Sequence, residues 1–415
     1  MPSLRLAALA AAILSLSLCA SASAASAKKE RPVWGFIARI LNEHPEAQAA
    51  LARVDQAEAE ALALAAPLYN PSLELGVEDR RGAAGSPSAY DAGIAYTLEL
   101  GGKREARERT GAARAAAARA GGRSARNELA ARVLALLALR ESAMMLEANA
   151  ERQNKAVGRL ADALRRSYSA GDVGSADDAL GTILRSQAES DLFNARAQRA
   201  AAETALLSLC GCAAASLPTL STIPPKPPTL AAGEISRLAE NSLAVEAASS
   251  NVDAAQGEYD IARANRVPDP TISLGVGSDE RQSLARLGLS IPIPILNDGS
   301  READAKNRGV IVALRERDTI IREAFIRAQT AYDTYGFNVA AWESWSARSG
   351  SLDQRIGALE KLRSAGELSL TDFVVQLRET LDAEKQAAGV RNEAWQAYAE
   401  WLAATGQALT LAGGE

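Results

Sequence analysis

The sequence of 415 residues has a single histidine and three cysteines, which leaves few candidate metal ligands. His44 precedes Pro45 at the start of a helical pattern, and we interpret it as a capping or surface residue rather than a ligand. Cys210 and Cys212 supply only half of the four ligands of a closed zinc site. We therefore expect no metal site. The pair has two open interpretations, a disulfide formed in an oxidising compartment and a two-thiol ligand for a soft metal ion.

Aromatic residues make up only 4% of the chain, while alanine supplies much of its 47% hydrophobic content. A large globular core of the usual kind is therefore not expected. Alanine-rich, charge-laced sequence with long periodic segments instead predicts extended helices packed side by side. The net charge of -5 comes without a basic block, which argues against a nucleic-acid partner. No nucleophile–base set, phosphate loop or paired carboxylates stand out, so we predict neither an enzyme nor a cofactor.

Beyond its first residues the chain has no hydrophobic run long enough for a transmembrane helix. Near the N-terminus, Arg5 is followed by an apolar run over 6–18 and then by small residues. This pattern predicts a secretory signal peptide over residues 1–27, with the cleavage position left open. Leu18 precedes Cys19 where a lipobox has a small residue, so lipidation of Cys19 is the minor interpretation.

Two stretches about 200 residues apart repeat one another, and such a repeat fixes the architecture. The sequence NPSLELGV at 70–77 matches DPTISLGV at 269–276, and GKREA at 102–106 matches GSREA at 299–303. We therefore expect one unit of two strands and several helices, present twice. The predicted organisation is a first repeat over 28–217, a proline-rich linker over 218–232 and a second repeat over 233–415.

Strict alternation of apolar with small or polar residues predicts two strand hairpins. The expected apolar face comprises Leu73, Leu75, Val77, Ile94, Tyr96, Leu98, Leu100, Leu287, Leu289, Ile291, Ile293 and Ile295. A membrane barrel turns such a face to lipid, whereas a soluble α+β protein buries it. Four strands cannot close a barrel, because the smallest bacterial barrels have about eight, and lipid does not tolerate an open edge. A barrel therefore requires a dimer or a trimer.

Long helical patterns fill most of the remaining sequence. The expected helices cover 34–66, 103–166, 175–209, 234–265, 301–363 and a last segment that ends near 408. Apolar residues in the heptad spacing of coiled coils run over 311–342 and 374–402. The sequences SAGDVGSAD at 169–177 and SAGELSLTD at 364–372 break the two repeats at matching positions. The fold class is thus mainly α with a small β part.

The repeat, the hairpins, the sequence LELGGKR at 98–104 and Pro292-x-Pro294 before Asn297-Asp298-Gly299 together resemble TolC-type outer-membrane efflux proteins. LELGGKR and the modest length are most similar to the heavy-metal resistance branch of the CzcC type. The resemblance implies a homotrimer with a 12-stranded outer-membrane β-barrel, continued by an α-helical tunnel in the periplasm. It also implies a periplasmic adaptor and an inner-membrane pump of the resistance-nodulation-division class as partners.

The resemblance assigns roles to the two helical breaks, which correspond to the periplasmic tips. The residues expected to contact the adaptor are Gly171, Asp172, Val173, Gly366, Glu367 and Leu368. Asp372 takes the place of an aspartate that rings the aperture, Asp177 is its counterpart in the first repeat, and Arg363 is a candidate donor to Asp372 of a neighbouring tip. Both aspartates also fit a capping role, because acidic residues favour the first turn of a helix. Val375 replaces a second acidic residue of the family pattern, so a less acidic constriction is expected.

The sequence favours an outer-membrane exit duct for tripartite efflux in a Gram-negative bacterium, with heavy-metal cations as the expected cargo. Two alternatives stay open. The chain could be a soluble periplasmic scaffold that binds partners through its heptads, or a duct for drugs or secreted polypeptide. The cargo is weakly encoded because a duct does not hold it in a chemical site.

Overall fold

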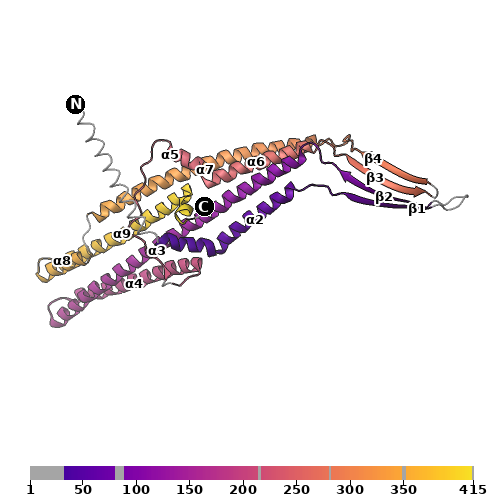
Figure 1. Cartoon of the computed structure of the whole chain (residues 1–415). Helices are drawn as coiled ribbons and strands as arrows, with labels where there is room; N and C mark the ends of the chain where they lie inside the picture. The colour runs from indigo at the N-terminus through magenta and orange to yellow at the C-terminus, as the bar shows by residue number, and fades with distance from the viewer. Residues whose placement is uncertain (1–31, 80–87, 214–215, 280–281, 348–351, 414–415) are drawn as a thin grey trace, which may run out of the picture. The chain divides into compact units, whose positions relative to one another are not determined.

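The computed structural model describes residues 32–79, 88–213, 216–279, 282–347 and 352–413 (Figure 1). The predicted signal peptide and Cys19 lie outside these residues. The chain divides into two compact units. One is formed by residues up to 48 with 125–239 and 325–415, and the other by 49–124 with 240–324. The chain is mostly helical with one small sheet, as the sequence predicts.

The helices follow the predicted pattern, with three interruptions that we did not expect. A helix over 32–43 precedes the first labelled element in Figure 1. The others are α2 (Pro45–Ala65), α3 (Lys103–Ala170), α4 (Ser175–Cys210), α5 (Glu234–Glu240), α6 (Leu243–Ala264), α7 (Ser300–Ser346), α8 (Leu352–Ser364), α9 (Leu370–Thr405) and α10 (Gln407–Leu411). Among these residues no helix is both long and apolar enough to cross a membrane.

Two of the interruptions have a local cause. The helix expected over 34–66 breaks at His44, because the residue before a proline is disfavoured in the α conformation, and α2 then starts at Pro45. His44 Nδ1 accepts a hydrogen bond from the backbone N–H of Glu46 at 3.1 Å, which confirms the capping interpretation. Ser242 starts a new helix within 234–265 by accepting from the backbone N–H of Val245.

The segment expected to be one helix over 301–363 is also divided. Helix α7 ends at Ser346 and α8 begins at Leu352. Ala347 lies in a turn directly after α7, and 348–351 lie outside the described residues. The single long helix of our prediction was therefore wrong at this point.

The four strands form one antiparallel sheet in the order β1-β2-β3-β4 (Figure 1). They are β1 (Ser72–Asp79), β2 (Ser88–Thr97), β3 (Thr271–Asp279) and β4 (Gln282–Ser290). The pairing of β2 with β3 joins the first repeat to the second, and it sets Ile94 opposite Leu274. Two strand ends differ from our expectation. Leu98 and Leu100 follow the end of β2, and Ile291, Ile293 and Ile295 follow the end of β4.

Proline accounts for the shorter β4. Pro292 and Pro294 have no backbone N–H to donate to a ladder, so pairing stops at Ser290. Helix α9 buries most of its predicted heptad seam. Its buried residues include nearly every heptad position predicted for it, namely Leu377, Leu381, Glu384, Ala388, Arg391, Trp395, Tyr398 and Leu402. In α7 the buried heptad positions are confined to Ala328, Tyr335, Val339 and Trp342.

Candidate functional site

The first helical tip, between α3 and α4, is built on Gly171. Its φ of 83° lies in the left-handed region that favours glycine. The backbone N–H of Gly171 donates to Tyr168 O at 3.0 Å, and that of Asp172 donates to Ser167 O at 2.9 Å. These two bonds form the Schellman motif, which satisfies the last carbonyl groups of α3. The sequence around Gly171 therefore ends one helix and turns the chain toward the next.

The second tip, between α8 and α9, repeats this geometry. Gly366 has a φ of 77°, its N–H donates to Arg363 O at 3.0 Å, and the N–H of Glu367 donates to Leu362 O at 3.0 Å. No atom lies within 4 Å of the position that a Cβ would take at either glycine. A side chain at Gly171 or Gly366 would thus be strained by the backbone conformation and not by packing.

The remaining predicted tip residues divide by exposure. Asp172 and Glu367 are exposed, so each turn presents one carboxylate to its surroundings. Val173 is half-buried, and Leu368 packs against an apolar cluster. The cluster is formed by Ala156, Val157, Leu160, Leu164, Ala188, Ile356, Leu359, Phe373, Leu377 and Leu381. It joins α3, α4, α8 and α9 and holds the two turns on one packed base.

Asp177 and Asp372 both lie in the first turn of the helix that follows their tip, and both take part in its cap. Ser369 Oγ accepts from the backbone N–H of Asp372 at 3.1 Å and donates to Asp372 Oδ2 at 2.7 Å. In the first repeat the backbone N–H of Gly174 donates to Asp177 Oδ2 at 3.3 Å. The carboxylate of Asp177 thus caps its helix directly, whereas Ser369 caps α9 and the carboxylate of Asp372 accepts from the Ser369 hydroxyl. Their role at an aperture stays a prediction, since a cap and a ring of charge are compatible.

Arg363 lies over an aromatic ring of its own chain. Its Cζ is 5.5 Å from the centroid of Phe373, which is buried, and its Nη1 is buried without a hydrogen-bond partner in the described part of the chain. Burial lowers the pKa of Arg363. Burial is the only cause of this shift, and no ion pair joins Arg363 to Asp372 among the described residues. The contact with Phe373 is a cation–π interaction. A hydrogen bond from Arg363 to an aspartate of a neighbouring copy stays a prediction.

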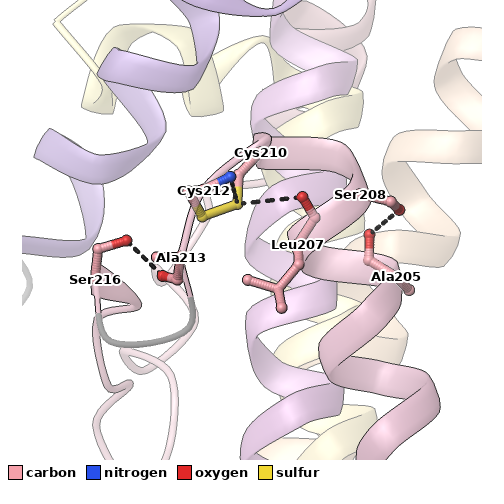
Figure 2. Close-up of a disulfide and its surroundings, with 7 residues drawn as sticks. All are labelled: Ala205, Leu207, Ser208, Cys210, Cys212, Ala213 and Ser216. Atoms are coloured by element: carbon pink, nitrogen blue, oxygen red, sulfur yellow. Dashed lines mark hydrogen bonds between the residues drawn. A yellow bond between two sulfur atoms is a disulfide. The ribbon is translucent and has the colours of Figure 1, made fainter.

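Cys210 and Cys212 form a disulfide at the end of α4 (Figure 2). Gly211 between them has a φ of 60° and donates its N–H to Leu207 O at 2.9 Å, which ends the helix. Of the two interpretations of this pair, the structure adopts the disulfide. Within the described ranges no group of three or more histidine, cysteine, aspartate or glutamate side chains could hold a metal ion.

The sheet presents a continuous apolar face that nothing in the described chain covers. Direct cross-strand pairing places its large side chains in rows, such as Leu73, Ile94, Leu274 and Leu287. These four side chains are 58–78% exposed. The other face carries mainly small and polar residues, with Leu284 as an apolar exception, and Ser72, Ala95, Ser273 and Gly288 form one of its rows. The predicted division between the two faces is therefore confirmed.

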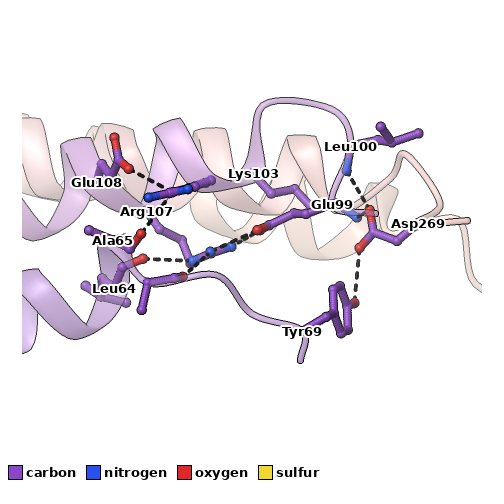
Figure 3. A network of polar contacts seen from close by, with 11 residues as sticks. Leu64, Ala65, Tyr69, Glu99, Leu100, Lys103, Arg107, Glu108 and Asp269 are labelled. Carbon is purple, nitrogen blue, oxygen red and sulfur yellow. Dashed lines mark hydrogen bonds and ion pairs between the residues drawn. The ribbon is translucent and has the colours of Figure 1, made fainter. Parts of the chain in front are cut away.

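A buried polar network fixes the point where the sheet meets the helices (Figure 3). Lys103 Nζ lies 2.7 Å from Asp269 Oδ1, and both side chains are less than a tenth exposed. Asp269 also accepts from the N–H of Leu100 at 2.9 Å and from the hydroxyl of Tyr69 at 3.1 Å. Burial alone would raise the pKa of Asp269, but these donors together outweigh it and hold the pKa below its usual value.

A second pair extends the network toward α2. Arg107 forms an ion pair with Glu99, and its Nε and Nη2 donate to Leu64 O and Ala66 O, each at 3.0 Å. Sequence reasoning found LELGGKR as a motif but did not assign roles to its side chains. Asp269 was visible only as the residue aligned with Asn70 in the repeat. No local pattern links Lys103 to a residue 166 positions away, so tertiary pairing was the missing information.

Comparison with known proteins gives three kinds of similarity. A family model described as "Outer membrane efflux protein" matches residues 36–212. The cobalt-zinc-cadmium resistance protein CzcC of Cupriavidus metallidurans is 30% identical over 241 residues, which are 55% of this chain. The match spans about half the length of that curated relative, 54%.

Two solved structures are similar over most of the chain. CusC has a TM-score of 0.74 and 15% identity, with 92% of this chain and 91% of CusC covered. The outer membrane channel CmeC of Campylobacter jejuni has a TM-score of 0.76 and 12% identity, with 91% and 86% covered. At this identity the likeness concerns the fold, which is that of TolC-like outer-membrane channels. The resemblance stated from the sequence is confirmed.

Proposed function

We propose that this chain is a member of the outer membrane efflux proteins and forms the exit duct of a tripartite efflux system, as a homotrimer in the outer membrane. The observation that carries the proposal is the uncovered apolar face of the four-stranded sheet, with open edges at β1 and β4. In water such an exposed apolar face favours aggregation, whereas in lipid it is the required outer surface of a barrel. Closure without edges then requires further copies of the chain.

Heavy-metal cations are the proposed cargo. The support is the similarity to CzcC, a cobalt-zinc-cadmium resistance protein by name, over half of each chain. The duct itself needs no metal site, because it only has to enclose a water-filled path. A periplasmic adaptor and an inner-membrane pump of the resistance-nodulation-division class are the proposed partners, with the adaptor docking at the turns of Gly171 and Gly366.

The aperture is proposed to lie at the same end. Three copies of Asp372 and Asp177 would form acidic rings whose charges repel when held close. Cations are favoured over anions at such a ring. Compensation by Arg363 of a neighbouring copy has less support, because its guanidinium lies over Phe373 of its own chain.

The test is metal export by a Gram-negative host that lacks its own metal exporter. The full chain is expressed with a matched adaptor and pump, and cellular zinc, cobalt and cadmium are measured. Accumulation should fall only when all three components are present, and the chain should fractionate with the outer membrane. Protein found in the soluble periplasmic fraction would instead support the scaffold alternative. Unchanged metal with reduced accumulation of drugs would reassign the cargo.

A further inference from the structure

The two outer strands of the sheet carry opposite charge on its polar face. The polar face of β1 holds Glu74 and Glu78, whereas the charged residue that β4 contributes to that face is Arg286. Arg286 is exposed and forms no ion pair with the described residues. Pairing β1 with β1 of another copy would bring acidic residues together, and pairing β4 with β4 would oppose two arginines. Pairing β4 with β1 joins unlike charges, and such head-to-tail contacts close into rings.

The internal repeat gives the register of that contact. Strand β3 repeats β1, and β4 repeats β2, because the hairpin β1–β2 and the hairpin β3–β4 have the same pairing pattern. The junction between β2 and β3 is therefore an observed copy of the junction that β4 would make with β1 of the next protomer. In the observed junction Ala95 lies opposite Ser273, and Asp91 lies opposite Gly277.

From this correspondence we propose that β4 of one copy pairs antiparallel with β1 of its neighbour, with Ser290 opposite Glu74 and Arg286 opposite Glu78 of that neighbour. The proposal rests on the proposed trimeric barrel and specifies its subunit interface. The ion pair was not used to choose the register. The charges favoured the choice of the two strands, whereas the register follows from transferring the β2–β3 junction.

Barrel geometry gives a second check. In this register a row of directly opposed residues starts at Glu74, passes through Arg286 and returns to β1 of the next copy at Glu78. The row thus advances by about one residue per strand, which tilts the strands by about 35° given the rise per residue and the strand spacing. Transmembrane barrels have tilts of about 35–45°. A register shifted by two residues gives about 19° in one direction, which is outside this range, and about 46° in the other, which is at its upper limit, so the tilt argues against the first shift only.

The base of the sheet supports the same correspondence. At the observed junction the charged pair Lys103 and Asp269 is buried. Their counterparts in the repeat are Ser300 and Asn70, both uncharged and both exposed in the single chain. Both members of the pair are replaced together, so the corresponding contact between copies would hold two neutral polar groups. Before assembly, a single protomer therefore has no unpaired charge at this position, and such a charge would be costly to bury.

Cysteine cross-linking tests the register directly. The background is Cys210→Ser with Cys212→Ser, so that the native disulfide does not compete. Glu74→Cys with Ser290→Cys should give dimers and trimers on non-reducing gels after mild oxidation. The slipped pairs Ser72→Cys with Ser290→Cys and Gly76→Cys with Ser290→Cys should cross-link several-fold less, because diagonal neighbours are about 7–8 Å apart rather than 4.5–5.5 Å.

Charge reversal tests the ion pair. Arg286→Glu should lower the yield of gel-stable trimer several-fold, and adding Glu78→Arg should restore it. Arg286→Glu with Glu74→Arg is the matched control and should not restore it, since Glu74 lies opposite Ser290. A membrane trimer in which a slipped pair cross-links best would overturn the register alone. A chain that forms no trimer at all would overturn the proposed function itself.

Discussion

Leu287 lies on the apolar face near the middle of β4, and its replacement by arginine distinguishes a lipid-facing sheet from a soluble one. The side chain is 78% exposed and shares a row with Leu274, Ile94 and Leu73. Arginine on the lipid face of a barrel costs about 2–4 kcal/mol near the bilayer midplane. A trimer holds three copies of the change, so assembly would lose about 6–12 kcal/mol.

The matched control lies on the opposite face of the same strand. Ser290→Arg places the same side chain on the polar face, where the neighbouring Arg286 is already tolerated. We expect Leu287→Arg to abolish the gel-stable trimer and Ser290→Arg to retain most of it, measured by heat-dependent dissociation of outer-membrane extracts. On the surface of a soluble protein, both changes would stay within about 0.5 kcal/mol. Equal behaviour of the two variants would refute a lipid-facing sheet.

Four further predictions concern the junction and the tips. Lys103→Met should lower the free energy of unfolding in urea by about 3–5 kcal/mol, because it leaves Asp269 buried without its cation, whereas Arg104→Met removes an exposed pair worth at most about 1 kcal/mol. The pKa of Asp269 is lowered in the folded protein, so its contribution to stability is present above its unfolded pKa of about 3.9 and is lost as the pH falls below that value. Asp269→Asn should remove this acid dependence, measured by urea titrations at several pH values. Gly366→Val should abolish metal resistance without removing the protein from the membrane, whereas Gly366→Asn, which tolerates positive φ, should retain it; resistance in both would refute the tip assignment. Asp372→Asn keeps the cap but removes charge, so it should weaken cation selectivity in planar bilayers, and unchanged selectivity would leave Asp372 as a cap only.

The sequence predicts this fold well where periodicity carries the information. Alternation in Leu73, Leu75 and Val77 identifies a strand face, and the heptads of α9 identify its buried side. The glycines of the two tips are predictable because a matching turn occurs twice. The periodicity does not predict a helix break that depends on a single residue, such as the breaks at Pro45 and Ser242.

The side-chain network at the base of the sheet was beyond sequence reasoning. Asp269 receives three donors from segments far from it in sequence, and nothing in the order of residues states which of them will meet. The environment of Arg363 was missed for a similar reason. Its stacking on Phe373 depends on how two helices meet around a glycine turn, which periodicity does not specify.

Single-channel recording from the detergent-purified full chain in planar lipid bilayers tests the central claim most directly. A trimeric duct should insert and give discrete, cation-selective conductance steps of one size. The Leu287→Arg variant, which should fail to assemble, should give no conductance steps under the same conditions. Folded wild-type protein that stays monomeric in solution without detergent and gives no conductance would contradict the account.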